Sequence, residues 1–480
     1  MNQTSEGGIN CFSLPQKHYA FFFPDHGPTF STGSWREQGL TSHKVGDVIN
    51  ERLYRDPVHN IIALDCNNPD DLILMRLIDT PEMQRLRRIR QLGLASYAYQ
   101  GAEHSRFTHS IGVMWIANRI LARLMQERTV SPRLALATRC AALLHDVGHG
   151  PLSHIFESVL GVHHEEWTRR ILLNRSSQIN VILREASPSL PRAVIDVIEG
   201  RGNPPFLSQI ISSQLDADRF DYLLRDGLMT GVKYGIYDLE RILHILRLDK
   251  AGRHIVIASN GVMPVEKYLQ SRYSMYLQVY LHKTVRASET MLSRLLLRAG
   301  DLARQNKLPL ATDNEPLSRM LRDGTQASLG DFLLVDDDSV YSHMKHWSNS
   351  PDPILQDFSR RLLERRLFKT IDITHTRGLR RKLQLARSAL RDAGLDPRYY
   401  FIVDESTNVP YRPYDAQSPE TTRHILVEDN KHPKGTRDLH EVSEVVRGLT
   451  RAAFTIRRAI FPSDVDGFNL REKMDEIFSE

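Results

Sequence analysis

A histidine and an aspartate stand side by side in the segment CAALLHDVGHGPLSH, residues 140–154, which otherwise has the apolar character of a buried helix. His145 and Asp146 follow four apolar residues directly, and two more histidines come within the next eight positions. A buried aspartate without a partner is strongly destabilising. A divalent metal would neutralise the carboxylate and use the lone pair of the imidazole. The segment therefore predicts part of a metal site.

Two other segments offer the remaining ligands. In HSRFTHSIG, Arg106 and His109 are three residues apart and so share one face of a helical turn. In DADRFDYLLRD, Asp218 stands at the start of a further segment with helical spacing. Together His109, His145, Asp146 and Asp218 give two imidazoles and two carboxylates. This set suits Mn, Mg, Fe, Zn or Ni, with positions left for water and substrate.

Helices must position these residues. Apolar residues recur at helical spacing through most of residues 51–300, as in HSIGVMWIANRILARLMQER and PRLALATRCAALLHDVG. The segment DTPEMQRLRRIRQLG predicts a basic helix that begins after Thr80 and ends at Gly93. If the helix before His145 continues to Gly150, His149 lies on the same face as His145.

The pattern changes beyond residue 300. Short strand candidates, RLFKTIDI, RYYFIVDE and RHILVED, occur among basic segments expected to be helical, Arg377–Lys382 and Arg447–Arg458. We therefore expect a mainly α protein with an irregular N-terminal extension (1–50), an all-helical core (51–300) and a smaller α+β C-terminal lobe (301–480).

Composition narrows the class of protein. The 480 residues are 41% hydrophobic and 25% charged, as is usual for soluble globular proteins, and no apolar run approaches the length of a membrane span. We expect a cytoplasmic protein without a membrane partner, because the N-terminus has no secretory signal pattern. Three cysteines are too few for a disulfide framework. The net charge of +5 leaves nucleic acid open as a partner.

The motifs RFTH, LLHDVGHGPLSH, HHEE and LDADRFDYLLRD resemble those of the HD-domain phosphohydrolases. Within them the chain is most similar to the deoxynucleoside triphosphate (dNTP) triphosphohydrolases, the branch that includes the vertebrate SAM- and HD-domain enzyme and its bacterial relatives. YRDPVHNIIAL and LIDTPEMQRLRRIRQLG match that branch as well. The resemblance implies an all-helical HD-domain core and metal-dependent cleavage of a dNTP into a deoxynucleoside and inorganic triphosphate.

Site roles follow from the resemblance residue by residue. It implies catalytic roles for Arg106, His149, His164 and Glu165, with His164 as the candidate general acid, which suits a group that titrates near neutral pH. Arginine can also bind a phosphate with two parallel hydrogen bonds. The substrate-binding set is Gln91, Leu92, Arg106, His149, His154, Arg219, Tyr222, Asp226, Arg272 and Tyr280. Gln91 and Leu92 would meet the sugar edge and exclude a 2′-hydroxyl, and Asp226 and Tyr280 would hold the 3′-hydroxyl.

Regulation is implied by the same resemblance. Members of this branch are often oligomers, and we expect a homodimer or homotetramer switched on by GTP or a dNTP. The matching allosteric residues are Asp79, Gln84, Arg87, His282 and Lys283. Arg55 and Tyr276 depart from the vertebrate pattern, so the activator and the preferred base stay open.

Two alternatives remain at this point. One is an HD-type phosphodiesterase or nucleotidase acting on another nucleotide, which leaves the many phosphate-binding arginines without a role. The other is a nucleic-acid-binding or nucleotide-sensing module, suggested by the basic segments Arg377–Lys382 and Arg447–Arg458.

Overall fold

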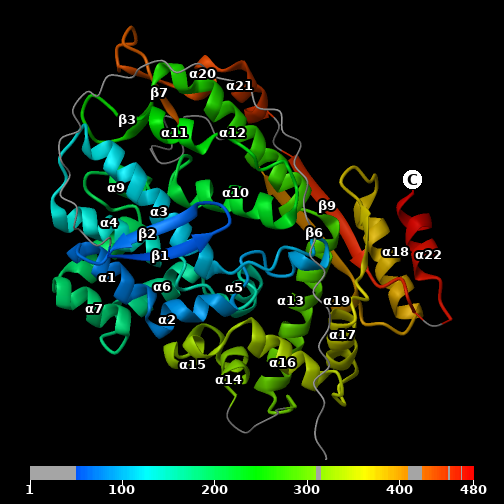
Figure 1. Ribbon diagram of the computed structural model, residues 1–480. Coiled ribbons are helices and arrows are strands. Elements are labelled where there is room, and N and C mark those ends of the chain that lie inside the picture. Colours follow the sequence, from blue (N-terminus) through cyan, green and yellow to red (C-terminus); the bar gives the residue numbers. More distant parts are fainter. Residues whose placement is uncertain (1–49, 310–314, 409–423, 452–453, 466, 480) are drawn as a thin grey trace, which may run out of the picture. The chain divides into compact units, whose positions relative to one another are not determined.

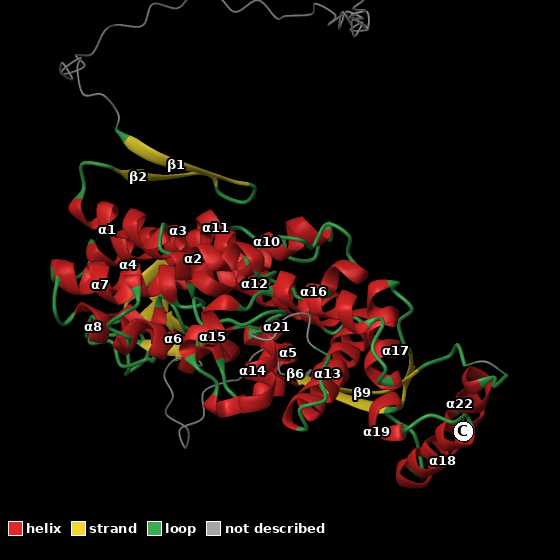
Figure 2. Cartoon of the chain, turned by 90° about the horizontal axis from the view of Figure 1, so that it is seen from below, coloured by secondary structure: helices red, strands yellow, loops and turns green. Residues whose placement is uncertain are grey.

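Helices dominate the computed structural model, which describes residues 50–309, 315–408, 424–451, 454–465 and 467–479 (Figures 1 and 2). The mainly α fold class expected from the sequence is confirmed. The extension expected over residues 1–50 lies outside the described residues apart from Asn50. No helix in the described ranges has both the length and the apolar character needed to cross a membrane.

The first elements are strands, although an all-helical core was expected here. β1 (Glu51–Asp56) and β2 (Asn60–Asp65) pair in an antiparallel hairpin. Asp56 stabilises the turn by accepting hydrogen bonds from the backbone N–H groups of Val58 and His59, at 2.8 and 3.0 Å. This turn fixes the backbone of His59.

The helices that follow build the core around the predicted metal ligands. They are α1 (Pro69–Ile78), α2 (Pro81–Arg85), α3 (Arg106–Met125), α4 (Pro132–Leu144), α5 (His154–Leu160), α6 (His164–Leu173), α7 (Gln178–Ala186), α8 (Leu190–Ile198), α9 (Phe206–Gln209), α10 (Ala217–Thr230), α11 (Leu239–Ile245), α12 (Val262–Met275) and α13 (Lys283–Arg304). β3 (Leu246–Leu248) and β4 (Ile255–Ile257) separate α11 from α12. A five-residue π-helical segment, η4 (Tyr276–Tyr280), follows α12; such segments are frequent at functional sites.

The long basic helix expected to end at Gly93 is much shorter. Thr80 caps α2 as expected, but α2 ends at Arg85 and one 3-10 turn, η1 (Leu86–Arg88), follows. The backbone then turns to pair with the chain before α3: Gln91 N–H donates to the carbonyl of His104, and Arg106 N–H to that of Ile89. These bonds replace helical ones and bring residues 89–91 beside Arg106.

The C-terminal part mixes helices and strands as expected. Its elements are α14 (Pro316–Asp323), α15 (Leu329–Leu334), α16 (Asp337–Trp347), α17 (Pro353–Leu363), β5 (Lys369–Asp372), α18 (Leu379–Asp392), α19 (Pro397–Tyr400), β6 (Ile402–Asn408), β7 (Leu426–Glu428), β8 (Thr436–Asp438), α20 (Leu439–Val442), α21 (Glu444–Arg451), β9 (Phe454–Phe461) and α22 (Leu470–Phe478). All three strand candidates contain a strand, and Arg377–Lys382 leads into α18.

The second basic segment, Arg447–Arg458, is not one helix. α21 ends at Arg451 and β9 begins at Phe454. β9 is the middle strand of the sheet β5–β9–β6, so pairing on both sides outweighs the helical pattern of the local sequence. In Figure 1 this sheet runs between α13 and the pair α18 and α22.

The expected boundary at residue 300 falls inside α13. Strand β7 from the C-terminal part pairs in parallel with β4 from the helical part. One continuous hydrophobic cluster also contains both Ile62 and Phe478. The division into a core and a lobe therefore stays a prediction, and the two parts share one hydrophobic core.

Candidate functional site

Three helices bring the predicted metal ligands together. His109 lies on the first turn of α3, His145 and Asp146 directly follow α4, and Asp218 lies on the first turn of α10. Asp218 Oδ1 is 3.1 Å from Nε2 of His109 and 3.7 Å from Nε2 of His145. Asp146 completes the group, with its two oxygens 3.7 and 3.3 Å from the same two Nε2 atoms.

Both imidazoles are oriented for metal binding. Nδ1 of His109 donates to Oδ2 of Asp221, and Nδ1 of His145 donates to the carbonyl of Ala142, at 2.8 and 2.9 Å. Each bond leaves the lone pair on Nε2, and both Nε2 atoms are buried without a hydrogen-bond partner among the described residues. Metal-bound histidines are held in this way in general. The donor set therefore fits a divalent metal.

The charge of the cluster also calls for a cation. Burial alone would lower the pKa of His109, but the carboxylates of Asp218 and Asp221 outweigh it and raise the pKa to about 10. The same negative charge stabilises a divalent ion.

Asp221 contacts the predicted metal ligand His109, and the sequence reasoning missed it. Its side chain is fully buried, and its two oxygens accept from His59 and His109, while Arg225 donates to both. Nη1 of Arg225 in turn donates to Oδ2 of Asp56 at 2.8 Å. Arg225 and Asp221 therefore connect the β1–β2 hairpin to the predicted metal ligand His109. Gly112 permits this contact, because a Cβ there would lie 1.9 Å from Oδ1 of Asp221. The sequence could have indicated Asp221 by its spacing from Asp218, because residues three apart lie on the same face of a helix.

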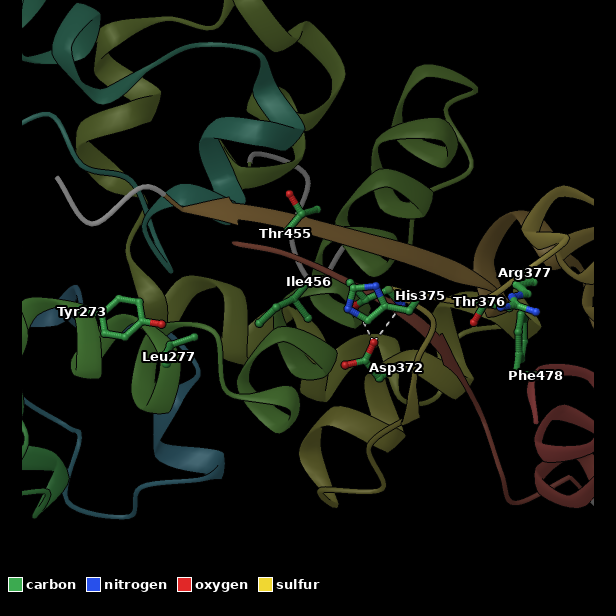
Figure 3. Close-up of a pocket in the computed structure, with 10 residues that line it drawn as sticks. Tyr273, Leu277, Asp372, His375, Thr376, Arg377, Thr455, Ile456 and Phe478 are labelled. Atoms are coloured by element: carbon green, nitrogen blue, oxygen red, sulfur yellow. Dashed lines mark hydrogen bonds between the residues drawn. The ribbon is translucent and has the colours of Figure 1, made fainter. Parts of the chain in front are cut away.

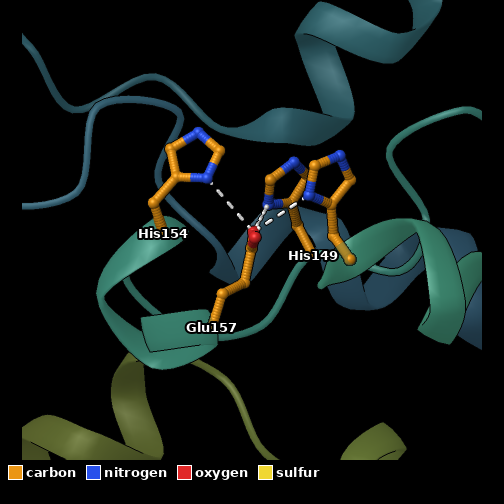
Figure 4. Close-up of side chains that lie close together, drawn as sticks. His149, His154 and Glu157 are labelled. Atoms are coloured by element: carbon orange, nitrogen blue, oxygen red, sulfur yellow. Dashed lines mark hydrogen bonds and ion pairs between the residues drawn. The ribbon is translucent and has the colours of Figure 1, made fainter. Parts of the chain in front are cut away.

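A second cluster gathers around Glu157, which was also missed. One oxygen of its carboxylate lies 3.3 Å from Nδ1 of His149, 3.2 Å from Nδ1 of His154 and 3.0 Å from Nδ1 of His164 (Figure 4). The rings of His149 and His164 stack with their centroids 3.9 Å apart. His149 also links the two clusters, since its Nε2 is 3.4 Å from Oδ1 of Asp146.

The members of the second cluster differ in the direction of their pKa shifts. Burial and the nearby Arg106 lower the pKa of His149 to about 4. Burial also acts to lower the pKa of His164, but the hydrogen bond to Glu157 and the charges of Asp146 and Glu157 together raise that pKa. The three imidazoles, opposing the effect of burial, hold the pKa of Glu157 far below its usual range. His164 is therefore the member suited to carry a proton near neutral pH.

The helix before His145 does not continue to Gly150, so His149 does not reach the cluster by helical spacing. α4 ends at Leu144 and a turn follows. Gly148 in that turn contacts the start of α6, where a Cβ would lie 2.2 Å from the carbonyl oxygen of His164. This close approach brings His149 against His164.

Arg106 is held between the two clusters. It donates to Asp146 and, through Nε and Nη2, to Oγ of Ser153 at 3.0 and 2.8 Å. Leu152 and Ser153 have positive φ angles of 53° and 58°, a conformation that is uncommon for such residues. The buried Asp337 supports this turn, because it accepts from the backbone N–H groups of Leu152 and Arg90 at 2.7 and 2.9 Å.

A cavity of about 760 Å³ opens onto these groups. Most of the predicted substrate-binding residues line it, namely Gln91, Leu92, Arg106, His149, His154, Arg219, Tyr222, Asp226 and Tyr280. The metal ligands Asp146 and Asp218 and the candidate acid His164 line it too. Helix α13 supplies a wall that the sequence reasoning missed, with Arg286, Glu289, Thr290 and Ser293.

The two residues predicted to hold the sugar, Asp226 and Tyr280, contact each other. The Tyr280 hydroxyl donates to Oδ2 of Asp226 at 2.7 Å, and Nε2 of His104 lies 2.8 Å from Oδ1. Arg219 binds Asp216 and the carbonyl of Ser213.

Two of the predicted catalytic and substrate-binding residues, Arg272 and Glu165, do not line the cavity. Arg272 donates to Oε1 of Gln214 at 2.6 Å and lies beside the Tyr276 ring instead. Glu165 is exposed on α6, because the first turn of that helix points its side chain to solvent. Glu157 is the glutamate that contacts the candidate acid.

The predicted allosteric residues fall in two groups, and no described contact joins them. Asp79 binds Arg52 through both oxygens, Arg87 donates to Gln84 at 2.7 Å, and the guanidinium of Arg87 lies 3.7 Å from the centre of the Phe107 ring.

The second group lies where α13 begins. His282 packs against Tyr99, and Lys283 lines a separate cavity of about 310 Å³. A further cavity of about 720 Å³ lies beside β5 and β9 (Figure 3). It shares no lining residue with the cavity of about 760 Å³ that opens onto the metal cluster.

Comparison with known proteins agrees with this geometry. Residues 106–226 match the HD domain, and residues 237–328 match the HD-associated region. The Bacillus subtilis protein YwfO is 35% identical over 426 residues, which cover 88% of this chain and 94% of YwfO. Human deoxynucleoside triphosphate triphosphohydrolase SAMHD1 is 29% identical over 287 residues, 52% of this chain and 45% of SAMHD1.

Solved structures show the same fold. A phosphohydrolase from Bacteroides thetaiotaomicron superposes with a TM-score of 0.72 at 28% identity and covers 86% of this chain and 99% of its own. A protein from Aquifex aeolicus gives a TM-score of 0.66 at 26% identity, covering 89% of this chain and 99% of its own. The chain therefore belongs to the HD-domain family that also includes the SAMHD1 triphosphohydrolases, and whose HD domain binds a divalent metal.

Proposed function

We propose that this protein hydrolyses deoxynucleoside triphosphates at the α-phosphorus and releases a deoxynucleoside and inorganic triphosphate. The observation that carries the proposal is the cavity in which a metal cluster, a histidine cluster and the pair Asp226 and Tyr280 meet. A cyclic or monophosphate substrate would not need the arginines that also line it.

His109, His145, Asp146 and Asp218 would hold the metal. When bound there, a divalent ion supplies an acidified water and neutralises charge on phosphate oxygens. Arg106 and Arg219 bind the phosphates, since a guanidinium donates two parallel hydrogen bonds to phosphate oxygens. The fixed contacts of Arg106 with Ser153 keep it oriented before substrate arrives.

His164 acts as the general acid. Its raised pKa keeps a proton available near neutral pH, and Glu157 holds the ring in place. The proton goes to the 5′-oxygen of the deoxyribose as the bond from that oxygen to the α-phosphorus breaks. Asp226, held by Tyr280 and His104, accepts a hydrogen bond from the 3′-hydroxyl, and Leu92 excludes a 2′-hydroxyl.

Regulation is part of the proposal. Asp79, Gln84 and Arg87 read an activating GTP or dNTP, and His282 and Lys283 contact its phosphates, in a dimer or tetramer of this chain. The 53% exposure of the Asp79 side chain supports a contact at the surface, where Arg52 pairs with both of its oxygens.

Chromatography of the products tests the function. The purified protein is incubated with each dNTP and Mn²⁺ or Mg²⁺, alone and with GTP or a second dNTP. Deoxynucleoside and triphosphate are the expected products, with faster release when the activator is present. Monophosphate products would instead favour the other HD-type nucleotidase reactions. Absence of turnover with metal bound would favour a nucleotide-sensing or nucleic-acid-binding module.

A further inference from the structure

Helix α13 presents one polar face to the cavity. Arg286, Glu289, Thr290 and Ser293 all line it, and their spacing of three, four and seven residues puts them on one side of the helix. α13 packs against α5 and β6, as Figure 1 shows, so this wall is fixed on both sides. None of the roles assigned above uses these residues.

Glu289 is the unusual member of this wall. Four carboxylates line the cavity: Asp146, Asp218, Asp226 and Glu289. The first two belong to the metal cluster, and Asp226, which His104 and Tyr280 hold, is assigned above to the 3′-hydroxyl. Oε2 of Glu289 accepts from Arg286 at 2.8 Å, whereas Oε1 has no hydrogen-bond partner among the described residues and is not sealed from solvent.

The carboxylate is also held in position. Arg286 donates through Nε and Nη2 to the two oxygens of Asp404, at 3.1 and 2.5 Å, and through Nη1 to Glu289. Asp404 is buried in β6 and anchors the guanidinium. Burial raises the pKa of Glu289, and the adjacent guanidinium of Arg286 opposes this shift. The cavity therefore contains a fixed carboxylate oxygen that accepts no hydrogen bond from the described residues.

The signs of the charges orient the substrate. A triphosphate is attracted to the metal cluster and to Arg106 and Arg219, and it is repelled by the Glu289 carboxylate, whose guanidinium partner Arg286 is shared with Asp404. The other polar end of a nucleotide is its base. A wall whose free group is an acceptor needs a base with N–H donors.

The bases differ in how many donors they offer side by side. Guanine presents N1–H and the 2-amino group next to each other on one edge, whereas the amino groups of adenine and cytosine each stand beside a ring acceptor. Thymine has one N–H between two carbonyls. Two adjacent donors match a carboxylate best.

We propose that Glu289 reads the guanine base and makes this chain selective for deoxyguanosine nucleotides. The inference rests on the proposed function, because it takes the cavity to be the nucleotide site. A site built to hydrogen-bond a substrate rejects analogues that lack the donor, since its own polar group is then left unpaired.

Comparison of dGTP with dITP tests the proposal, because dITP lacks only the 2-amino group. The wild-type kcat/KM for dGTP is expected to exceed that for dITP about tenfold or more. In Glu289→Gln this ratio falls toward one, while kcat/KM for dATP changes little. The matched control is Glu444→Gln on α21, whose side chain is 83% exposed and pairs only with Arg447 among the described residues. The control keeps the wild-type ratio.

Equal wild-type constants for dGTP and dITP would overturn the proposal, and this result does not depend on how any variant folds. An unchanged ratio in a folded Glu289→Gln, judged by its thermal midpoint, would overturn it as well. Calorimetric binding of deoxyguanosine and deoxyinosine separates this failure from failure of the proposed function. Selective binding without dNTP hydrolysis would support Glu289 and contradict the hydrolase.

Discussion

Nδ1 of His109 donates a hydrogen bond to Oδ2 of Asp221, and the other oxygen of Asp221 accepts from Nε2 of His59, 2.7 Å away. A residue of the N-terminal hairpin turn thus helps to set the orientation of a metal ligand on α3. His59→Gln is expected to weaken Mn²⁺ binding about tenfold or more, as loss of such outer partners generally does.

Isothermal calorimetry with Mn²⁺ measures this effect directly. His244→Gln is the matched control, since His244 is exposed on α11, and its affinity is expected to equal that of the wild type. Wild-type affinity in His59→Gln would show that Asp221 orients His109 without help from the hairpin.

Glu157 sets the protonation of His164. Glu157→Gln removes the carboxylate charge that, together with Asp146, raises the pKa of His164, so that pKa falls. A general acid must be protonated, so the alkaline limb of the kcat–pH profile is expected to move to lower pH. At pH 8 we expect kcat to fall about 100-fold.

Glu166→Gln provides the control for that profile. Glu166 is exposed on α6 and pairs with Arg170 at 3.0 Å, so its replacement leaves the limb in place. An unshifted alkaline limb in Glu157→Gln would contradict the assignment of His164 as the acid.

Asp337 makes stability depend on pH. Burial raises its pKa from 3.8 to about 6, although the N–H groups of Arg90 and Leu152 act in the opposite direction. The raised pKa means that the folded state favours the protonated form. The contribution is therefore fully present below pH 3.8 and is lost as the pH rises through about 6. The shift corresponds to about 3 kcal/mol.

The free energy of unfolding, measured in urea between pH 4.5 and 7, tests this coupling. The wild type is expected to lose stability relative to Asp337→Asn as the pH rises. Asp338→Asn, at the exposed neighbouring position, is expected to run parallel to the wild type. A pH-independent difference between wild type and Asp337→Asn would contradict the prediction.

Leu92 bears on the choice between deoxyribose and ribose. Its side chain lines the same cavity as Asp226 and Tyr280, so Leu92→Ala is expected to open space for a 2′-hydroxyl. The ratio of kcat/KM for GTP to that for dGTP is expected to rise about tenfold. Leu72→Ala, with Leu72 43% exposed on α1, should leave it unchanged. An unchanged ratio in Leu92→Ala would mean that another residue excludes the ribonucleotide.

The metal cluster could be predicted because its residue types are rare in apolar helices. His145 and Asp146 after an apolar segment demand a counter-charge, and His109 and Asp218 stand at the starts of two other helical segments. The supporting residues could not be predicted in the same way. Asp221, Glu157 and Asp337 act through contacts between helices far apart in the sequence, and local spacing does not specify such contacts.

The same distinction holds for the fold. Long periodic segments such as Arg106–Met125 are helices as expected, because burial of one face stabilises them. The helix expected through Gly93 ends early because residues 89–91 bond to the chain before α3. β9 forms because β5 and β6 pair on either side of it. In both cases tertiary hydrogen bonds override the local pattern.

The central claim is that water attacks the α-phosphorus in this cavity. We would incubate the protein with dGTP and Mn²⁺ in ¹⁸O-labelled water and weigh the products by mass spectrometry. The account predicts unlabelled deoxyguanosine and inorganic triphosphate carrying one ¹⁸O atom. Release of dGMP, or label in the deoxyguanosine, would contradict it.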